Sequence, residues 1–513
     1  MRILTFLLFS LVITGCADSE SSESTPGPDQ IVRLSDSEIK GLDPQKISDL
    51  SSLRVAADQF EGLTRHNAQG EIEAGLAKSW TVTPDGLKWT FLLRQGLKFS
   101  DSVPISAQLF EGIFDRLKDP KTASPTQALF ENILAVQARD NEVIVSLKNP
   151  APQLPELLTH PALSAIPLHR IARVGDAWTN DRPMVTSGAY QLDRWLLNDH
   201  AKLTYNANWH ENRKPIKTII WKPMDDSLSG MRLFLSGGAD ITADYPPSRH
   251  HWLKENYPLN VHNVPYLGSY YFAFNTRYPP FDDARVRRAL SMAVEREWIA
   301  EKVIGVGNPP AWGLLPPGLA SDDSYLPNWA SWPRDQRLEV ARSLLSDAGY
   351  DSNNPLRFEI RFNSSAEHRR VSVALAAMWK SLNVEASLFN SEAALHFAAL
   401  RQHNFTLARS GWIADLPTQE NFLLVHQQAN GSGNYSGYDN SKYNVTLASA
   451  IAEPDPQKRS HLMRDAEKIL IDDMPILPLY FYVTRSLVSE RVSGWENNIS
   501  NVHPSRTLRI RVK

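Results

Sequence analysis

Cys16 is the only cysteine in a chain of 513 residues. No disulfide can form within the chain, so a fold of this length must be stabilised by the size of its hydrophobic cores. Because domains typically contain about 50–250 residues, two or three packed units are expected. Hydrophobic residues make up 42% of the chain and charged residues 22%, which is typical of globular proteins.

The segment that ends at Cys16 has the pattern of a bacterial lipoprotein signal peptide. Arg2 supplies a positive charge, the apolar run from Ile3 to Ile13 follows, and Thr14-Gly15 places small residues before the cysteine. This run is too short to span a bilayer, whose hydrocarbon core is about 30 Å thick. We therefore predict a signal peptide over residues 1–16 with lipidation at Cys16. A plain secretory signal with a chance cysteine is the alternative.

Residues 17–30 are rich in Ser, Glu and Pro and show no apolar period. Such a composition is typical of a flexible tether. Together with the predicted lipid on Cys16, it indicates a protein anchored to a membrane and located in the periplasm or on an extracytoplasmic face. Which membrane holds the anchor stays open.

Strand and helix patterns alternate along the chain, which indicates the α/β class. Residues 89–94 and 143–147 have the composition of strands. Apolar residues recur at helical spacing over 334–348 and again over 371–382. A strand, helix, strand succession across 356–388 predicts a βαβ unit.

Charge and motifs give little support to catalysis or nucleic-acid binding. The formal net charge of −3 offers no basic surface for nucleic acid. No zinc-protease, paired-cysteine, dinucleotide, Walker A or serine-hydrolase motif is found, so we expect no enzyme, no cofactor and no metal. The pair His250-His251 is interpreted as part of a solvent-exposed loop rather than as a metal site.

Several segments, in the same order along the chain, resemble family 5 of the extracellular solute-binding proteins, and especially its peptide-binding members. They cover the chain from about residue 31 to its end. The sharpest is Ala408-Arg409-Ser410-Gly411-Trp412-Ile413-Ala414-Asp415; the others are residues 59–63, 75–80, 89–101, 119–125, 270–275 and 280–290.

The resemblance implies a fold of two lobes that close like a clamshell around a two-segment hinge, with an additional domain. It implies a monomer without catalysis that captures oligopeptides and delivers them to the permease of an ABC importer in the membrane. Its expected units are a discontinuous lobe I (residues 31–58, 184–267 and 484–513), the additional domain (59–183) and lobe II (268–483).

The resemblance also implies ligand-binding residues. Asp415 matches the position whose carboxylate receives the α-ammonium of the ligand, and a fixed carboxylate suits a buried ammonium. Gly411 and Ile413 would offer backbone groups, and Trp412 an aromatic wall. An Asp that caps its own loop, and a Trp that packs in the core, are the alternatives.

At the carboxylate end of the ligand, the family places cationic side chains at different depths for different ligand lengths. Arg409, Arg401 and His368 match these positions, and an Arg fork can bond both carboxylate oxygens. For each, a surface charge or a structural ion pair remains an alternative. Tyr270, Tyr271 and residues 480–482 would line the cleft or the hinge, or pack in the core.

The chain departs from the family pattern at Ser102, Gly112 and Leu416. These differences leave the pocket shape and the preferred peptide length open. A murein peptide, a nickel chelate, haem or a sugar is the alternative ligand, because a fold does not determine what it binds. A lipid-anchored periplasmic hydrolase is the alternative from another class.

Overall fold

The computed structural model describes residues 26–212, 215–319, 325–414, 416–427, 431 and 433–511. The predicted signal peptide with Cys16, most of the predicted tether, and Asp415 lie outside these residues. Two large hydrophobic cores organise the described part. One gathers residues from both chain ends and from Phe60 to Trp221, and the other gathers residues between Leu267 and Val483.

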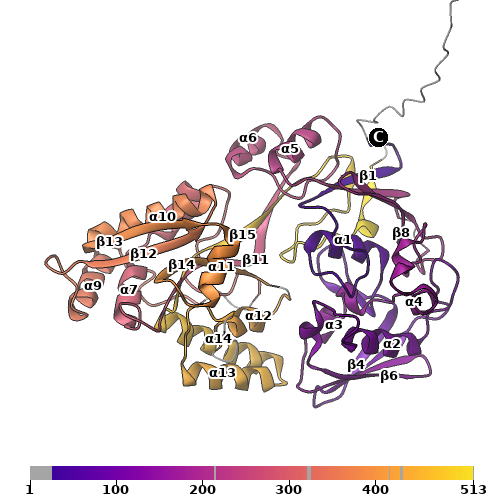
Figure 1. Ribbon diagram of the computed structural model, residues 1–513, viewed down its shortest axis with the longest axis horizontal. Helices are drawn as coiled ribbons and strands as arrows, with labels where there is room; N and C mark the ends of the chain where they lie inside the picture. The colour runs from indigo at the N-terminus through magenta and orange to yellow at the C-terminus, as the bar shows by residue number, and fades with distance from the viewer. Residues whose placement is uncertain are drawn as a thin grey trace, which may run out of the picture.

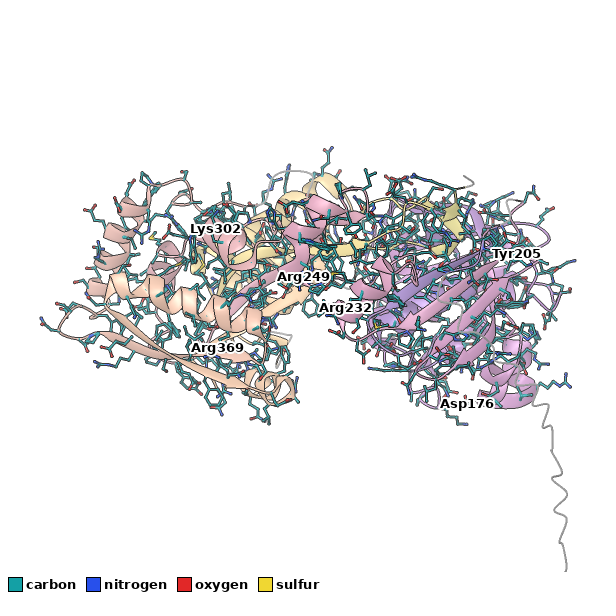
Figure 2. All side chains as sticks on the ribbon, turned by 90° about the horizontal axis from the view of Figure 1, so that it is seen from above. Asp176, Tyr205, Arg232, Arg249, Lys302 and Arg369 are labelled. Carbon is teal, nitrogen blue, oxygen red and sulfur yellow. The ribbon has the colours of Figure 1, made fainter. Side chains whose placement is uncertain are left out.

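The two cores belong to two separate halves of the molecule (Figure 1). The half drawn mainly in indigo and purple contains both ends of the described chain, and the orange half contains the middle of the chain. Seen from above, Lys302 and Arg369 lie on one half and Asp176 and Tyr205 on the other (Figure 2). The predicted α/β clamshell with its two lobes is therefore confirmed, whereas the residue limits of the three units stay a prediction.

Among the described residues, the half with the chain ends contains two four-stranded sheets and two two-stranded sheets, β2-β3 and β16-β17. One four-stranded sheet has the order β1-β10-β9-β8, in which β1 and β10 are parallel, and the other is the antiparallel sheet β4-β5-β7-β6. The strands are β1 (Gln30–Ser35), β2 (Thr64–His66), β3 (Ile72–Ala74), β4 (Ala77–Val82), β5 (Lys88–Leu93), β6 (Ile133–Arg139), β7 (Glu142–Leu147), β8 (Tyr190–Leu196), β9 (His200–Tyr205), β10 (Thr218–Pro223), β16 (Val492–Ser493) and β17 (Arg509–Ile510).

Short helices pack on these sheets. In β5 every second residue is buried, which is the pattern of a strand with one face on a core. The helices of this half and of the connection to lobe II are α1 (Leu50–Gln59), α2 (Ala107–Lys118), α3 (Leu154–Leu157), α4 (Leu168–Val174), α5 (Ser227–Leu235) and α6 (His250–Asn256).

Lobe II is built on one mixed sheet of five strands in the order β13-β12-β14-β11-β15. Its strands are β11 (Val261–Phe274), β12 (Leu356–Asn363), β13 (Val384–Ser391), β14 (Leu407–Ile413) and β15 (Ile476–Leu487). Its helices are α7 (Ala284–Met292), α8 (Arg296–Trp298), α9 (Arg334–Asp347), α10 (Ala366–Trp379), α11 (Ala393–Arg401), α12 (Gln419–Leu423), α13 (Ser441–Ala452) and α14 (Pro456–Asp473).

The elements expected from sequence pattern are present. The strands predicted over 89–94 and 143–147 are β5 and β7, and the predicted helices are α9 and α10. The side chain of Ser365 accepts hydrogen bonds at the start of α10, which explains why the helix begins there. Strands β12 and β13, on either side of α10, pair in parallel, as the predicted βαβ unit requires.

Strands β11 and β15 form the two-segment connection between the halves. They pair antiparallel over almost their whole length, and both continue past the lobe II sheet toward α5 and α6 (Figure 1). The pairing is interrupted between Pro265 and Ser269, where the ladder shifts register. A break in a ladder locally bends and loosens the strand pair, so this is where the two lobes would turn against each other.

Candidate functional site

Strand β14 has a backbone edge that no strand covers near its C-terminal end. On the side of β11, the carbonyl oxygen of Thr406 accepts from the N–H of Asn275, and the N–H of Ala414 donates to the carbonyl oxygen of Leu267. The alternation of an antiparallel ladder directs the even-numbered residues between Thr406 and Ala414 to the same side. The N–H and C=O groups of Arg409, Gly411 and Ile413 therefore point to the opposite side. Strand β12 pairs there only with Leu407 and Ala408.

His396 of α11 occupies part of this edge. Its Nε2 donates to the carbonyl oxygen of Arg409 at 2.8 Å. For Gly411 and Ile413, no backbone partner on this side is found in the described part of the chain. These two residues therefore present backbone groups to which an extended ligand could add as a further strand.

Arg409 is a cation held by neutral groups. Its Nη2 donates to the hydroxyl of Tyr482 at 2.9 Å, Nη1 lies 3.4 Å from Oδ1 of Asn363, and the guanidinium lies 4.9 Å from the centre of the Tyr270 ring. Its Nε is buried without a hydrogen-bond partner, and no carboxylate of the described residues lies within 4.0 Å. A partly buried guanidinium without a counter-ion is suited to an anionic ligand group.

His368 joins the same cluster through Tyr270. Its Nδ1 lies 3.1 Å from the Tyr270 hydroxyl, and the Tyr270 ring stacks on that of Tyr480 at 4.4 Å between centres. The Tyr480 hydroxyl donates to Oε1 of Glu367 at 2.8 Å. Burial, and then the charge of Arg409, lowers the pKa of His368 to about 3. At neutral pH His368 is therefore an uncharged hydrogen-bonding group, and Arg409 carries the positive charge of the cluster.

The predicted residues Gly411, Trp412 and Ile413 differ in their surroundings. Trp412 is half-buried against the lobe II core, and its Nε1 donates to Oδ1 of Asn421 at 2.8 Å. The side chain of Ile413 is exposed. Gly411 lies under the ring of Tyr482, where a side chain has little room. Thus Gly411 and Ile413 leave the edge of β14 accessible, while the indole of Trp412 is fixed by a partner of its own.

Arg401 and Asp415 are not brought together with this cluster. Arg401 is exposed at the last turn of α11, and no described contact joins it to Arg409 or His368. Asp415 lies outside the described residues, between Ala414 and Leu416. The roles predicted for these two residues remain predictions.

Gly411→Ala should weaken ligand binding about tenfold. A Cβ at this position would lie 2.9 Å from the hydroxyl of Tyr482 and 3.0 Å from the carbonyl oxygen of Ser269. Because the tyrosine must move, its hydrogen bond to Arg409 is lost, a change worth about 1.4 kcal/mol. Calorimetric titration with a bound peptide measures the effect. Gly27→Ala, where the nearest atoms lie at 3.4 Å or more, should leave affinity unchanged; equal affinities of both variants would contradict this account.

Burial keeps several histidines neutral, and this predicts acid sensitivity. The lowered pKa values are about 4 for His160 and His396, about 3 for His368 and His426, and about 2 for His503, each mainly because of burial. The unfolded chain, with histidine pKa near 6.5, binds more protons below that pH. The free energy of unfolding should therefore fall as pH drops from 6.5 toward 4.

His396→Gln tests this prediction for one residue. Between about pH 6 and 4, the unfolding free energy of this variant should change with pH less steeply than that of the parent chain, by roughly 1 kcal/mol per pH unit. Urea unfolding at a series of pH values gives the slopes. An unchanged slope in the His396 variant would show that His396 is not kept neutral.

A cavity of about 270 Å³ begins at Ala414, just after the end of β14. Ala414, Leu416 and Pro417 of lobe II border it, but most of its wall comes from the half with the chain ends, including α1, β1 and the segment from Trp495 to Arg506. Arg409, His368 and Gly411 do not line it.

Sequence reasoning missed the cavity wall and misjudged one histidine pair. Arg33, Arg54 and Trp495 come from distant segments, and no spacing signal joins them. His250 begins helix α6 and is buried, with its Nδ1 2.7 Å from the Tyr245 hydroxyl, so the expected exposed loop is wrong for His250, whereas the side chain of His251 is exposed as predicted. Packing against Tyr245, which no local pattern reveals, is the reason. Within the described ranges, no group of His, Cys, Asp and Glu could hold a metal, and no helix is long and apolar enough to cross a membrane.

Two lobes joined by a pair of strands, with a strand edge on lobe II that is only partly covered among the described residues, are typical of two-lobed binding proteins. The sequence supports this class. Residues 71–434 match the family described as bacterial extracellular solute-binding proteins, family 5 middle. The chain belongs to this family.

Relatives whose names state what they bind align with this chain over almost its full length. The periplasmic oligopeptide-binding protein OppA of Salmonella typhimurium is 33% identical over 96% of this chain and 94% of its own. The periplasmic murein peptide-binding protein MppA of Escherichia coli is 31% identical over 98% of this chain and 97% of its own. The probable deoxycholate-binding periplasmic protein YgiS of Escherichia coli is 31% identical over 92% of both chains. All three are named as binding proteins.

Solved structures indicate the arrangement of the lobes. The periplasmic murein tripeptide-binding protein MppA in its unliganded open form, 31% identical, matches with a TM-score of 0.83 over 95% of this chain and 98% of its own. Another structure of MppA from Escherichia coli, also 31% identical, gives 0.77 over 94% and 98%.

Proposed function

We propose that this protein captures short peptides in the cleft between its lobes and delivers them to the membrane permease of an ABC importer. The observation that carries the proposal is the site on β14: a backbone edge at Gly411 and Ile413, without a partner among the described residues, ends at the partly buried Arg409, which has no described carboxylate within 4.0 Å. A peptide main chain supplies what the edge can bond, and a peptide carboxylate supplies the missing negative charge.

The edge suits ligands of varied sequence. Pairing through the backbone uses only groups that all peptides share, so the side chains are free to differ. From Ile413 to Arg409 the strand advances about 14 Å, which is roughly the length of four extended residues. Peptides of about three to five residues therefore fit between the edge and the guanidinium. Arg401, which is exposed on α11, would meet the carboxylate of longer ligands.

The amino end of the ligand is assigned to Asp415. The match of residues 408–415 to the family motif supports this role, since a free α-ammonium in a closing cleft needs a negative partner. His368, neutral at physiological pH, would add a hydrogen bond near the carboxylate end. The peptide names of two full-length relatives support the same ligand class.

We also infer where the protein works. The signal pattern that ends at Cys16 supports a lipid anchor, and residues 17–30 would tether the folded lobes to the membrane surface. The three relatives named above are periplasmic proteins. In this proposal the protein is a monomer without catalytic activity that is anchored to its membrane and serves a permease there.

Native mass spectrometry of the protein purified from its own host, without denaturation, tests the proposal. A bound population of peptides should appear, and their masses after release should fall at about three to five residues. A murein peptide would be recognised by its diaminopimelate mass. Exclusive release of a bile acid or a sugar would reject the proposed ligand class, and peptides cut during incubation would reject the absence of catalysis.

A further inference from the structure

A carboxylate lies beside the tyrosines that hold Arg409. Glu367 is the second residue of α10, and its Oε1 accepts from the hydroxyl of Tyr480 at 2.8 Å. The ring of Tyr480 lies edge-on to that of Tyr482, with 6.1 Å between the centres. The hydroxyl of Tyr482 in turn accepts from Nη2 of Arg409 at 2.9 Å. A negative and a positive side chain are therefore connected through one pair of tyrosines.

The second oxygen of this carboxylate is available to a ligand. No described residue donates a hydrogen bond to Oε2 of Glu367, and this oxygen is not buried, since the side chain is only partly covered. Within the described ranges, no lysine, arginine or histidine nitrogen lies within 4.0 Å of the carboxylate. The carboxylate can therefore accept from a cation of the ligand without giving up an existing ion pair.

The cations around Glu367 have other partners or are exposed. Arg485 of β15 is near enough that the charge of Glu367 helps to raise its pKa, after the larger effects of burial, which lowers it, and of Asp244, which raises it. Its guanidinium, however, donates to both oxygens of Asp244, at 2.9 Å and 2.7 Å. Arg369, labelled in Figure 2, and Arg370 follow on α10 and are exposed. None of them forms a short ion pair with Glu367.

The place of Glu367 in its helix suggests a second, purely structural role. An acidic residue in the first turn of a helix is favourable because of the helix dipole. The end of α10 is already capped by the side chain of Ser365, which accepts from the N–H groups of Glu367 and His368. The two roles predict different results, because only recognition of a ligand depends on the charge of that ligand.

We propose that Glu367 selects a basic side chain, lysine or arginine, in the last residue of the bound peptide. This inference rests on the proposed function, because it needs a peptide whose carboxylate meets Arg409. A lysine side chain extends about 6 Å from its Cα, which matches the 6.1 Å between the rings of Tyr480 and Tyr482. Its stem lies over the partly exposed ring of Tyr482, and its ammonium group pairs with Glu367.

Calorimetric titration with six tripeptides tests the inference at pH 7.5, where a lysine side chain is charged. The parent peptide is Ala-Ala-Ala, with lysine or norleucine placed at the first, second or third position. Norleucine keeps the four-carbon stem and lacks the ammonium group. At the third position we expect lysine to bind about fivefold more tightly than norleucine, the upper end of what a partly exposed ion pair contributes. At the first two positions we expect no such preference.

Variants assign the effect to this carboxylate. Glu367→Gln keeps an acceptor for the Tyr480 hydroxyl and removes the charge, so the lysine-to-norleucine affinity ratio at the third position should fall to about twofold or less. Glu339→Gln, which replaces an exposed glutamate of α9, is the matched control and should keep the ratio of the parent chain. Because each ratio compares two peptides within one variant, a general loss of stability does not change it.

Equal affinities for lysine and norleucine at the third position overturn the inference while peptide binding itself stands. An equal preference for lysine at all three positions overturns its placement in the last residue. A ratio that Glu367→Gln leaves unchanged overturns the assignment to Glu367 and leaves this residue only its role in stabilising α10. If none of the six peptides binds the parent protein, the proposed function fails, and the selection of a basic residue fails with it.

Discussion

Arg409→Gln should lower the affinity for a tripeptide with a free carboxylate about a hundredfold. The guanidinium is held by Tyr482, Tyr270 and Asn363 but has no described carboxylate partner, so a ligand carboxylate would be its counter-ion. Truncating one partner of a desolvated charge pair costs about 2–5 kcal/mol, and a hundredfold loss corresponds to about 2.7 kcal/mol. Calorimetric titration of parent and variant with Ala-Ala-Ala measures it.

The carboxy-terminal amide of the same peptide gives the specific control. It lacks the negative charge, so Arg409→Gln should change its affinity by threefold or less. Arg342→Gln, which replaces an exposed arginine of α9, should leave the affinity for both peptides unchanged. If the amide and the acid lose affinity equally in the Arg409 variant, the residue supports the structure of β14 and does not meet the carboxylate.

Asp415→Asn should lower the affinity for peptides with a free α-ammonium at least as strongly as Arg409→Gln lowers it for peptides with a free carboxylate, by about a hundredfold or more. The expectation rests on the family motif at residues 408–415, because the structure does not describe this side chain. An asparagine keeps the shape but removes the charge, and a buried ammonium without a negative partner is costly. Titration with a free and an acetylated tripeptide separates the effect of charge from that of shape.

The acetylated peptide should bind weakly to the parent chain and equally weakly to Asp415→Asn. Asp439→Asn is the matched control, because Asp439 lies in a loop and does not line the cavity. This variant should bind both peptides with the affinity of the parent. An Asp415 variant that keeps the parent affinity for the free peptide would assign this residue to capping its own loop, the alternative left open by the sequence.

Local patterns predicted the elements of the fold well. The sequence showed the alternating burial of β5, the apolar face of α9, and the unit of β12, α10 and β13. Each of these depends on residues close in sequence, so its hydrophobic period can be recognised from the sequence alone. The family motifs predicted the two-lobed arrangement, which cannot be inferred from hydrophobic periodicity. His250 shows the limit of local patterns, because its burial depends on a ring that packs on it from Tyr245.

The site was predictable only in part, for a physical reason. The position of Arg409 followed from a motif, but its lack of a counter-ion depends on Asn363 from β12, Tyr270 from β11 and Tyr482 from β15. The cavity wall likewise joins Arg33 near the start of the chain to Trp495 near its end. The balance of charges in such places depends on how distant segments pack together, so no regular spacing of residues in the sequence reveals it.

Titration of one tripeptide in four forms tests the central claim most directly: both ends free, the amine acetylated, the carboxylate amidated, and both ends blocked. The account predicts that the free form binds tightest, that each single block weakens binding at least tenfold, and that the doubly blocked form binds weakest of all. Four equal affinities, or no binding of any form, would contradict recognition of a peptide by its charged ends in this cleft.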